Sequence, residues 1–183
     1  MTAHQAALEA LTRYFGYDSF RPGQQGIVEA LLAGRDVLGV MPTGAGKSVC
    51  YQIPAALSPG MTLVISPLIS LMRDQVDALN DLGLPAAFIN TTQTPDEQAM
   101  VFAQAAAGQI KLLYVAPERL ETGRFRDFAA RTPISLIAVD EAHCVSQWGQ
   151  DFRSSYLGIG DFIAGLPQRP PVGAFTATAT ERV

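Results

Sequence analysis

The chain has 183 residues, of which 48% are hydrophobic and 16% are charged, and its formal net charge is −4. This composition is typical of a folded globular protein and excludes an intrinsically disordered chain. The negative net charge argues against a protein that coats DNA by bulk positive charge, although it allows a local basic groove.

Membrane, export and zinc signals are missing from the sequence. It has no run of about 18 apolar residues and no basic-then-apolar signal pattern at its start, so we expect a cytoplasmic protein with no membrane partner, nucleoid-associated if it is bacterial. Cys50 and Cys144 are the two cysteines, too few for a disulfide framework. His143 adjoins Cys144, but sequence neighbours rarely ligate one metal, so we expect no zinc.

Two helical patterns open the chain. Leu8, Leu11 and Phe15 recur at helical spacing, which predicts an amphipathic helix within the first fifteen residues. A second pattern covers 24–33 and ends at Gly34.

Short runs rich in Val, Ile and Leu then alternate with helical patterns. Thr94 to Glu97 forms a capping box with proline at the first helical position. Another helix stops at Gly83, and its predicted apolar face consists of Leu68, Leu71, Met72, Val76, Leu79 and Leu82. The predicted strands, apolar on both faces as buried parallel strands are, are 36–41, 62–66, 86–90, 112–116, 136–141 and 172–176.

This alternation predicts an α/β fold, a mostly parallel sheet with helices on both faces. No linker-like stretch divides the chain, so we expect one domain over 1–183. Polar clusters follow four of the strands, at 42–48, 66–67, 140–143 and 176–178. Ligands of open parallel sheets bind outside the carboxyl ends of the strands, so we expect these clusters to converge at one edge.

A glycine-rich loop, 42–48, lies between a predicted strand and a predicted helix, which is the context of a phosphate-binding loop. Its glycines let the backbone approach phosphate oxygens, and the following helix presents its positive end to them. Lys47 would bind the β- and γ-phosphates and Ser48 would hold Mg²⁺, so ATP and Mg²⁺ are the expected cofactors. Met41 departs from the usual glycine at the first position. The expected cofactor-binding residues of the loop are Met41, Pro42, Thr43, Gly44, Ala45, Gly46, Lys47 and Ser48.

Asp140 and Glu141 end the fifth predicted strand. By itself the pair is equally compatible with a solvated acidic turn. Together with the phosphate loop it predicts a site in which Asp140 and Ser48 bind the metal and Glu141 deprotonates the attacking water.

The chain resembles superfamily 2 helicases, whose motifs match 20–24, 41–48, 66–75, 140–143 and 176–179 in the same order. The fuller strings at 51–55 and 143–149 are similar to the RecQ family of DNA helicases. The resemblance covers nearly the whole chain and implies a RecA-like P-loop NTPase domain. Methionine at position 41 is an accepted variant in that family.

The resemblance implies that 1–34 form a helical adenine-recognition segment. Tyr17 and Arg21 match the residues that sandwich adenine, and Gln24 matches the glutamine that hydrogen-bonds the adenine edge. An amide offers one donor and one acceptor, and a ring and a guanidinium suit the base faces. Core packing is the alternative for Tyr17, and it is the preferred interpretation for Phe20.

The resemblance also implies DNA contacts or coupling to DNA. Residues 146–153 resemble the aromatic-rich loop that senses single-stranded DNA, in which Trp148 and Phe152 would stack on bases; a packed loop aromatic is the alternative for Trp148. Gln150 replaces the histidine of many family members. His143 belongs to the catalytic set with Lys47, Asp140 and Glu141. The expected DNA-binding or coupling residues are Ser66, Arg73, Trp148, Phe152, Arg153, Thr176 and Thr178.

By resemblance, the expected function is that of the first motor lobe of a helicase that moves 3′-to-5′ on single-stranded DNA and unwinds duplex in DNA repair and recombination. The expected partners are single-stranded and partly duplex DNA and a second motor lobe, which lies outside these residues together with the C-terminal domains. The chain alone is expected not to unwind DNA and to hydrolyse ATP weakly at most.

Two alternatives share parts of the pattern. A P-loop small-molecule kinase would carry an arginine-rich lid and an acceptor pocket instead of Asp-Glu-Ala-His. A catalytically silent DNA-binding module would be free to lose Lys47 or Glu141, and this chain keeps both.

Overall fold

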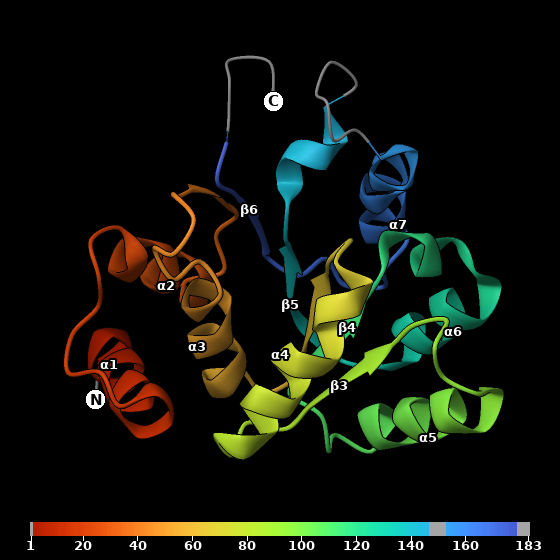
Figure 1. Cartoon of the computed structure of the whole chain (residues 1–183), viewed down its shortest axis with the longest axis horizontal. Helices are drawn as coiled ribbons and strands as arrows, with labels where there is room; N and C mark the ends of the chain where they lie inside the picture. Colours follow the sequence, from red (N-terminus) through yellow and green to blue (C-terminus); the bar gives the residue numbers. More distant parts are fainter. Residues whose placement is uncertain (1, 147–152, 179–183) are drawn as a thin grey trace.

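The computed structural model describes residues 2–146 and 153–178. Strands and helices alternate after two initial helices, as the sequence predicts, and Figure 1 shows the arrangement. The strands are β1 (Val37–Val40), β2 (Met61–Ile65), β3 (Ala86–Ile89), β4 (Leu112–Val115), β5 (Ile134–Val139) and β6 (Val172–Thr176). The α-helices are α1 (Ala3–Phe15), α2 (Gln24–Leu32), α3 (Val49–Leu57), α4 (Ile69–Asp81), α5 (Pro95–Ala106), α6 (Gly123–Arg131) and α7 (Ile159–Ala164). Short 3-10 helices are η1 (Pro117–Glu121), η2 (Ala142–Val145) and η3 (Ser154–Gly158).

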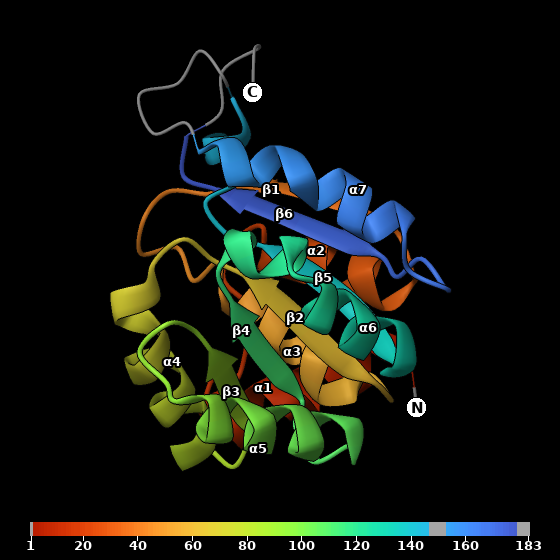
Figure 2. The same cartoon turned by 90° about the vertical axis from the view of Figure 1, so that its right-hand side faces the viewer.

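All six strands pair in parallel in the order β1-β6-β5-β2-β4-β3. Side chains of α2, α3 and α4 form one hydrophobic cluster against the sheet, and those of α5, α6 and α7 form another against the opposite face. Figure 2 shows α5, α6 and α7 on one side of the strands. The predicted α/β fold, with a parallel sheet covered by helices on both faces, is therefore confirmed.

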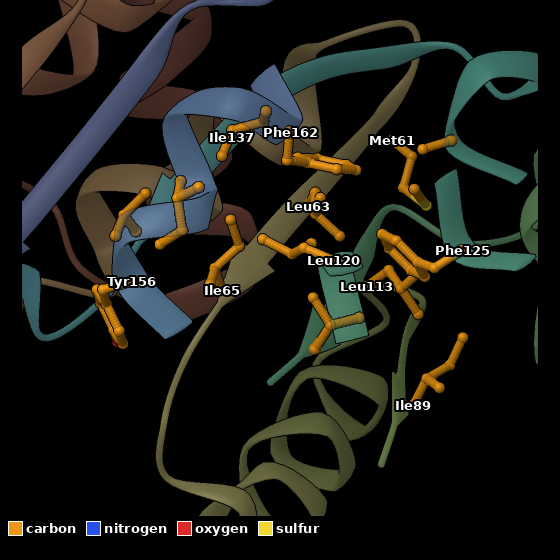
Figure 3. Close-up of a cluster of buried hydrophobic side chains, with 14 of the residues drawn as sticks. Met61, Leu63, Ile65, Ile89, Leu113, Leu120, Phe125, Ile137, Tyr156 and Phe162 are labelled. Atoms are coloured by element: carbon orange, nitrogen blue, oxygen red, sulfur yellow. The ribbon is translucent and has the colours of Figure 1, made fainter. Parts of the chain in front are cut away.

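The central strands are buried throughout. Every residue of β2 and β4 is buried, because each strand has a neighbour on both edges and helices on both faces. Figure 3 shows the larger cluster, in which Leu63 and Ile65 of β2 meet Leu113 of β4 and the rings of Phe125 and Phe162. This rigid layer fixes the positions at which the strands end.

Two predictions about burial are wrong in part. Leu38 and Val40 of β1 are 59% and 51% exposed. Side chains alternate along a strand, so Gly39 faces Ile27 and Phe175 while Leu38 and Val40 point to the opposite side. These two side chains lie at the edge of the sheet, because β1 is its outermost strand. On α4, Leu71 and Leu82 are also exposed, because the buried stripe of this helix runs through Met72, Val76 and Leu79.

The predicted capping box at the start of α5 is confirmed. Thr94 Oγ1 accepts a hydrogen bond from Glu97 N at 3.2 Å, and Glu97 Oε2 accepts one from Thr94 N at 2.7 Å. Within the described residues, no helix is long and apolar enough to cross a membrane.

Candidate active site

A cavity of about 550 Å³ opens at the carboxyl ends of the strands. Parts of the chain that are far apart in sequence meet there: the segment around α1 and α2, the loop after β1 with the start of α3, the region of α4, and the turn after β5. Of the four polar clusters predicted to converge, 42–48 and 140–143 contribute residues to this cavity, whereas 66–67 and 176–178 do not line it. Residues lining the cavity include Tyr17, Arg21, Gln24, Gly44, Gly46, Lys47, Ser48, Gln75, Asp140 and Glu141.

The phosphate loop depends on two glycines with positive φ. Gly44 has φ of 81° and Gly46 has φ of 79°, a backbone conformation that residues with a Cβ rarely adopt. At Gly46 a Cβ would also lie 2.5 Å from Gln24 Nε2, so alanine there would displace the Gln24 side chain. Glycine at position 46 therefore suits both the backbone conformation and the position of Gln24.

Lys47 and Ser48 lie at the junction of this loop with α3. The Lys47 ammonium donates to the Met41 carbonyl at 3.4 Å, so its side chain folds back toward the start of the loop. Ser48 already has right-handed helical geometry as the N-cap of α3. Met41 is buried and its sulfur lies 3.8 Å from Cys50 Sγ, so this unusual loop residue packs its side chain into the core.

Gln24 is 3% exposed and clamps the loop from the side of α2. Its Oε1 accepts a hydrogen bond from Arg21 N at 2.8 Å, and its Nε2 donates to Gly46 O at 3.0 Å. Arg21 Nη1 adds a bond to Gly44 O at 2.9 Å. Both ends of the Gln24 amide are thus engaged within the protein, a role in shaping the loop that the sequence alone did not indicate.

Tyr17 is exposed at the rim of the cavity. The Arg21 Cζ atom lies 5.8 Å from the centroid of the Tyr17 ring. An adenine between them would need two stacking contacts of about 3.5 Å each, so the ring and the guanidinium would have to move apart to admit it.

Asp140 and Glu141 form a tight turn directly after β5. Burial, and next the neighbouring Glu141 carboxylate, raise the pKa of Asp140, while Lys47 and His143 oppose this shift. Asp140 Oδ1 accepts a hydrogen bond from Glu141 N at 2.9 Å. Such a partly buried carboxylate next to a second one favours a cation at the site.

His143 links this turn to the end of β6. Its Nδ1 lies 2.9 Å from Thr176 Oγ1 and 3.4 Å from Glu141 Oε2. The Thr176 hydroxyl donates to Thr178 O at 2.9 Å and accepts from Thr178 N at 3.1 Å. The predicted coupling residues Thr176 and Thr178 therefore contact the acidic turn through this histidine.

The other predicted DNA-contact residues occupy different surroundings. Ser66 is fully buried and its Oγ accepts from Leu68 N at 3.3 Å, so in this structure the hydroxyl shapes the loop after β2 instead of facing solvent. Arg73 is exposed on α4, with its Cζ 5.6 Å from the Phe88 ring centroid. Arg153 is exposed before η3, while Trp148 and Phe152 lie outside the described residues.

One contact at the site was not predicted. The Tyr156 hydroxyl donates to the Asp140 carbonyl at 2.7 Å. The two residues are 16 positions apart, and no local sequence pattern pairs them.

No group of three or more His, Cys, Asp or Glu side chains in the described part of the chain is placed to hold a metal ion.

Comparison with known proteins agrees with this site. Residues 21–183 match the DEAD/DEAH box helicase family. The chain is 51% identical over 173 residues to the ATP-dependent DNA helicase RecQ of Haemophilus influenzae, covering 94% of this chain and 28% of that protein. It is 47% identical over 178 residues to the protein of the same name in Bacillus subtilis, covering 97% of this chain and 30% of that protein. The chain thus spans less than a third of the length of these relatives.

A solved structure shows the same fold. A hypothetical ATP-dependent RNA helicase from Sulfolobus tokodaii superposes with a TM-score of 0.73 at 21% identity, over 97% of this chain and 52% of that one. At this identity the likeness concerns the fold alone. With its phosphate loop and acidic turn meeting at one sheet edge and its match over residues 21–183, the chain belongs to the DEAD/DEAH box helicase family, in its RecQ branch.

Proposed function

We propose that this chain binds ATP with Mg²⁺ and hydrolyses it as the first motor lobe of a DNA helicase. One observation carries the proposal: Lys47, Ser48, Asp140 and Glu141, which come from two separate strand ends, line a single cavity. A charged loop without a partner carboxylate would bind phosphate but would have no group to activate water.

Each residue has a distinct task in this proposal. Backbone N–H groups of the loop and the Lys47 ammonium bind the phosphates. Ser48 and Asp140 hold Mg²⁺, whose charge offsets that of the phosphates. The raised pKa of the partly buried Asp140 beside Glu141 fits a site that takes a cation. Glu141 accepts the proton of the attacking water. His143, bonded to Thr176, orients Glu141 from the opposite side.

The adenine would lie at the other end of the cavity, between Tyr17 and Arg21 and next to Gln24. Because the Gln24 amide is bonded to Arg21 N and Gly46 O, reading the base would exchange one of these internal bonds for a bond to the adenine edge. Base recognition would thereby act directly on the loop that holds the phosphates.

The remaining parts of the proposal concern a larger protein. They comprise movement on single-stranded DNA in the 3′-to-5′ direction, duplex unwinding, and a role in repair and recombination. They require a second motor lobe, because translocation uses two lobes that open and close around ATP. A second lobe also supplies the arginine that stabilises the transition state, which contributes about 10³–10⁵ in rate. We therefore expect the 183-residue chain to hydrolyse ATP weakly and not to unwind DNA.

A binding experiment tests the ATP site. Lys47→Ala removes a charge-assisted hydrogen bond and should weaken Mg²⁺-ATP binding about 10- to 100-fold. Lys111→Ala is the matched control, because Lys111 is the other lysine of the chain and donates to Ser58 O, away from the cavity. Equal affinities of the Lys47→Ala variant and the parent in isothermal titration calorimetry would refute the phosphate-loop assignment.

A second measurement separates the helicase proposal from a kinase or a silent module. Stimulation of ATP hydrolysis by a single-stranded oligonucleotide supports the helicase. Stimulation by a small acceptor molecule instead would support a kinase, and binding of the oligonucleotide by a chain that never hydrolyses ATP would support a silent DNA-binding module.

A further inference from the structure

The turn that carries the two carboxylates has an uncommon backbone. Among the described residues other than glycine, Glu141 alone has a positive φ, of 52°, with ψ of 44°. Residues with a Cβ seldom adopt this left-handed conformation, and in native proteins it persists where neighbouring contacts hold it. Glu141 is the residue to which we assign the activation of water, so whatever holds its backbone also sets the direction of its carboxylate.

The peptide group between Asp140 and Glu141 is held at both of its polar atoms. Its carbonyl accepts a hydrogen bond from the Tyr156 hydroxyl at 2.7 Å, and its N–H donates to Asp140 Oδ1 at 2.9 Å. The preceding N–H, of Asp140, donates to Ile65 O in β2 at 2.9 Å. Fixing both sides of one peptide plane restricts rotation about the bond that defines φ of Glu141.

Tyr156 is well placed to give a rigid hold. It is 2% exposed and belongs to the hydrophobic cluster of Figure 3. The same cluster contains Ile65 of β2, whose carbonyl accepts from the Asp140 amide. The phenol spans from this core to the carbonyl of the catalytic turn.

The segment containing Tyr156 is also tied to the turn by its backbone. Tyr156 N donates to Arg153 O at 3.0 Å, and Arg153 N donates to Cys144 O in η2 at 3.0 Å. On the far side, Ser155 Oγ donates to Glu118 Oε1 at 3.0 Å. Residues 153–156 are thus joined both to the acidic turn and to η1.

We propose that Tyr156 is a positioning residue for ATP hydrolysis: its hydroxyl fixes the Asp140–Glu141 peptide so that Glu141 keeps its left-handed backbone and aims its carboxylate into the cavity. This inference rests on the proposed ATP hydrolysis. The alternative is that Tyr156 only fills the core, in which case its ring matters and its hydroxyl does not.

Tyr156→Phe separates these two roles, because it keeps the ring and removes the hydroxyl. The matched control is Tyr114→Phe at another tyrosine that is about as buried. Tyr51 and Gln52 lie beside the Tyr114 hydroxyl, but it forms no hydrogen bond of standard geometry within the described residues. Ser155→Ala is a second control, which loosens η3 from Glu118 and leaves the Asp140 carbonyl bond in place.

Hydrolysis is measured under single-turnover conditions, with the 183-residue chain in excess over radiolabelled ATP and Mg²⁺, at a temperature where all variants are folded by circular dichroism. We expect Tyr156→Phe to lower the hydrolysis rate about 10- to 100-fold, because a misplacement of reacting groups by about 1 Å can cost about 100-fold in rate. The dissociation constant for ATP in EDTA, which reports the phosphate loop, should stay within twofold of the parent. Tyr114→Phe should match the parent in both measurements, and Ser155→Ala should retain most of the rate.

An unchanged hydrolysis rate in folded Tyr156→Phe overturns the proposal. So does an equal loss of ATP binding in EDTA, because that outcome indicates a general disturbance of the site. If the parent itself does not hydrolyse ATP, the proposed function of the isolated chain fails separately. The positioning role is then judged by the Mg²⁺-dependent gain in affinity for a non-hydrolysable ATP analogue, which Tyr156→Phe should reduce and Tyr114→Phe should not.

Discussion

The two glycines of the phosphate loop form a matched pair of substitutions that isolates the contact between the loop and Gln24. Gly44 and Gly46 have nearly the same positive φ, 81° and 79°. A Cβ at Gly44 meets nothing within 4 Å, whereas a Cβ at Gly46 lies 2.5 Å from Gln24 Nε2. Alanine at either position therefore introduces the same backbone strain, and alanine at position 46 alone displaces the glutamine.

The magnitude follows from these contacts. Left-handed strain costs about 1–2 kcal/mol in each variant, and the lower entropy of the unfolded chain with alanine affects both equally. At position 46 the alanine Cβ displaces the Gln24 side chain, which is buried and bonded at both ends of its amide, so the amide loses its bonds to Gly46 O and Arg21 N. At about 0.5–1.5 kcal/mol for each bond, Gly46→Ala should cost about 1–3 kcal/mol more than Gly44→Ala.

Thermal unfolding followed by circular dichroism measures this difference. With about 2–4 °C per kcal/mol for a domain of this size, Gly46→Ala should unfold about 2–12 °C below Gly44→Ala. In a Gln24→Ala background the two alanine variants should unfold at the same temperature, because the displaced group is gone. Equal unfolding temperatures of Gly44→Ala and Gly46→Ala in the parent background would refute the reasoning.

Two further predictions concern the adenine end and the acidic turn. Gln24→Ala should weaken binding of ATP more than binding of GTP in parallel titrations; equal losses would assign Gln24 to the loop alone. Asp140→Asn should stabilise the fold at pH 8, because the pKa of Asp140 is raised from 3.8 and its ionised form therefore destabilises the folded state. The same variant should lose Mg²⁺-dependent nucleotide binding, because it removes the proposed carboxylate ligand of the metal. The gain should develop between pH 3.8 and the raised pKa and be absent at pH 3, where the parent carboxyl is protonated; urea denaturation at pH 3 and pH 8 checks it, and a gain of equal size at both would contradict it.

The fold follows from the sequence to a large extent, because buried parallel strands are continuous apolar runs and each of the six runs forms a strand. Burial at the sheet edge does not follow in the same way. Leu38 and Val40 have the composition of an internal strand, and their exposure is set by the strand order, which depends on pairings between distant segments. Local pattern carries no information on which strand lies outermost.

The same distinction applies to the site: residues in short motifs follow from the sequence, and contacts between distant segments do not. Lys47, Ser48, Asp140 and Glu141 belong to short motifs, and their position after predicted strands places them at one edge. The Gln24 clamp on Gly46 and the Tyr156 bond to Asp140 link residues 22 and 16 positions apart through the tertiary fold. The family resemblance and the complementarity of an amide to adenine predict the base as the partner of Gln24. The sequence does not reveal that the Gly46 carbonyl and the Arg21 N–H engage the same donor and acceptor within the protein.

The pairing of β1 with β6 is expected to set when the proposed nucleotide site can form during synthesis of the chain. β1 carries the phosphate loop, and its partner begins at Val172, whose N–H bonds Asp36 at a separation of 136 positions. Contacts of such long range form late, after the entropy of closing the intervening chain has been lost. A ribosome-bound chain that ends before β6 holds all of its phosphate-loop residues and lacks the strand that supports them, so nucleotide affinity should arise in one step once β6 has emerged.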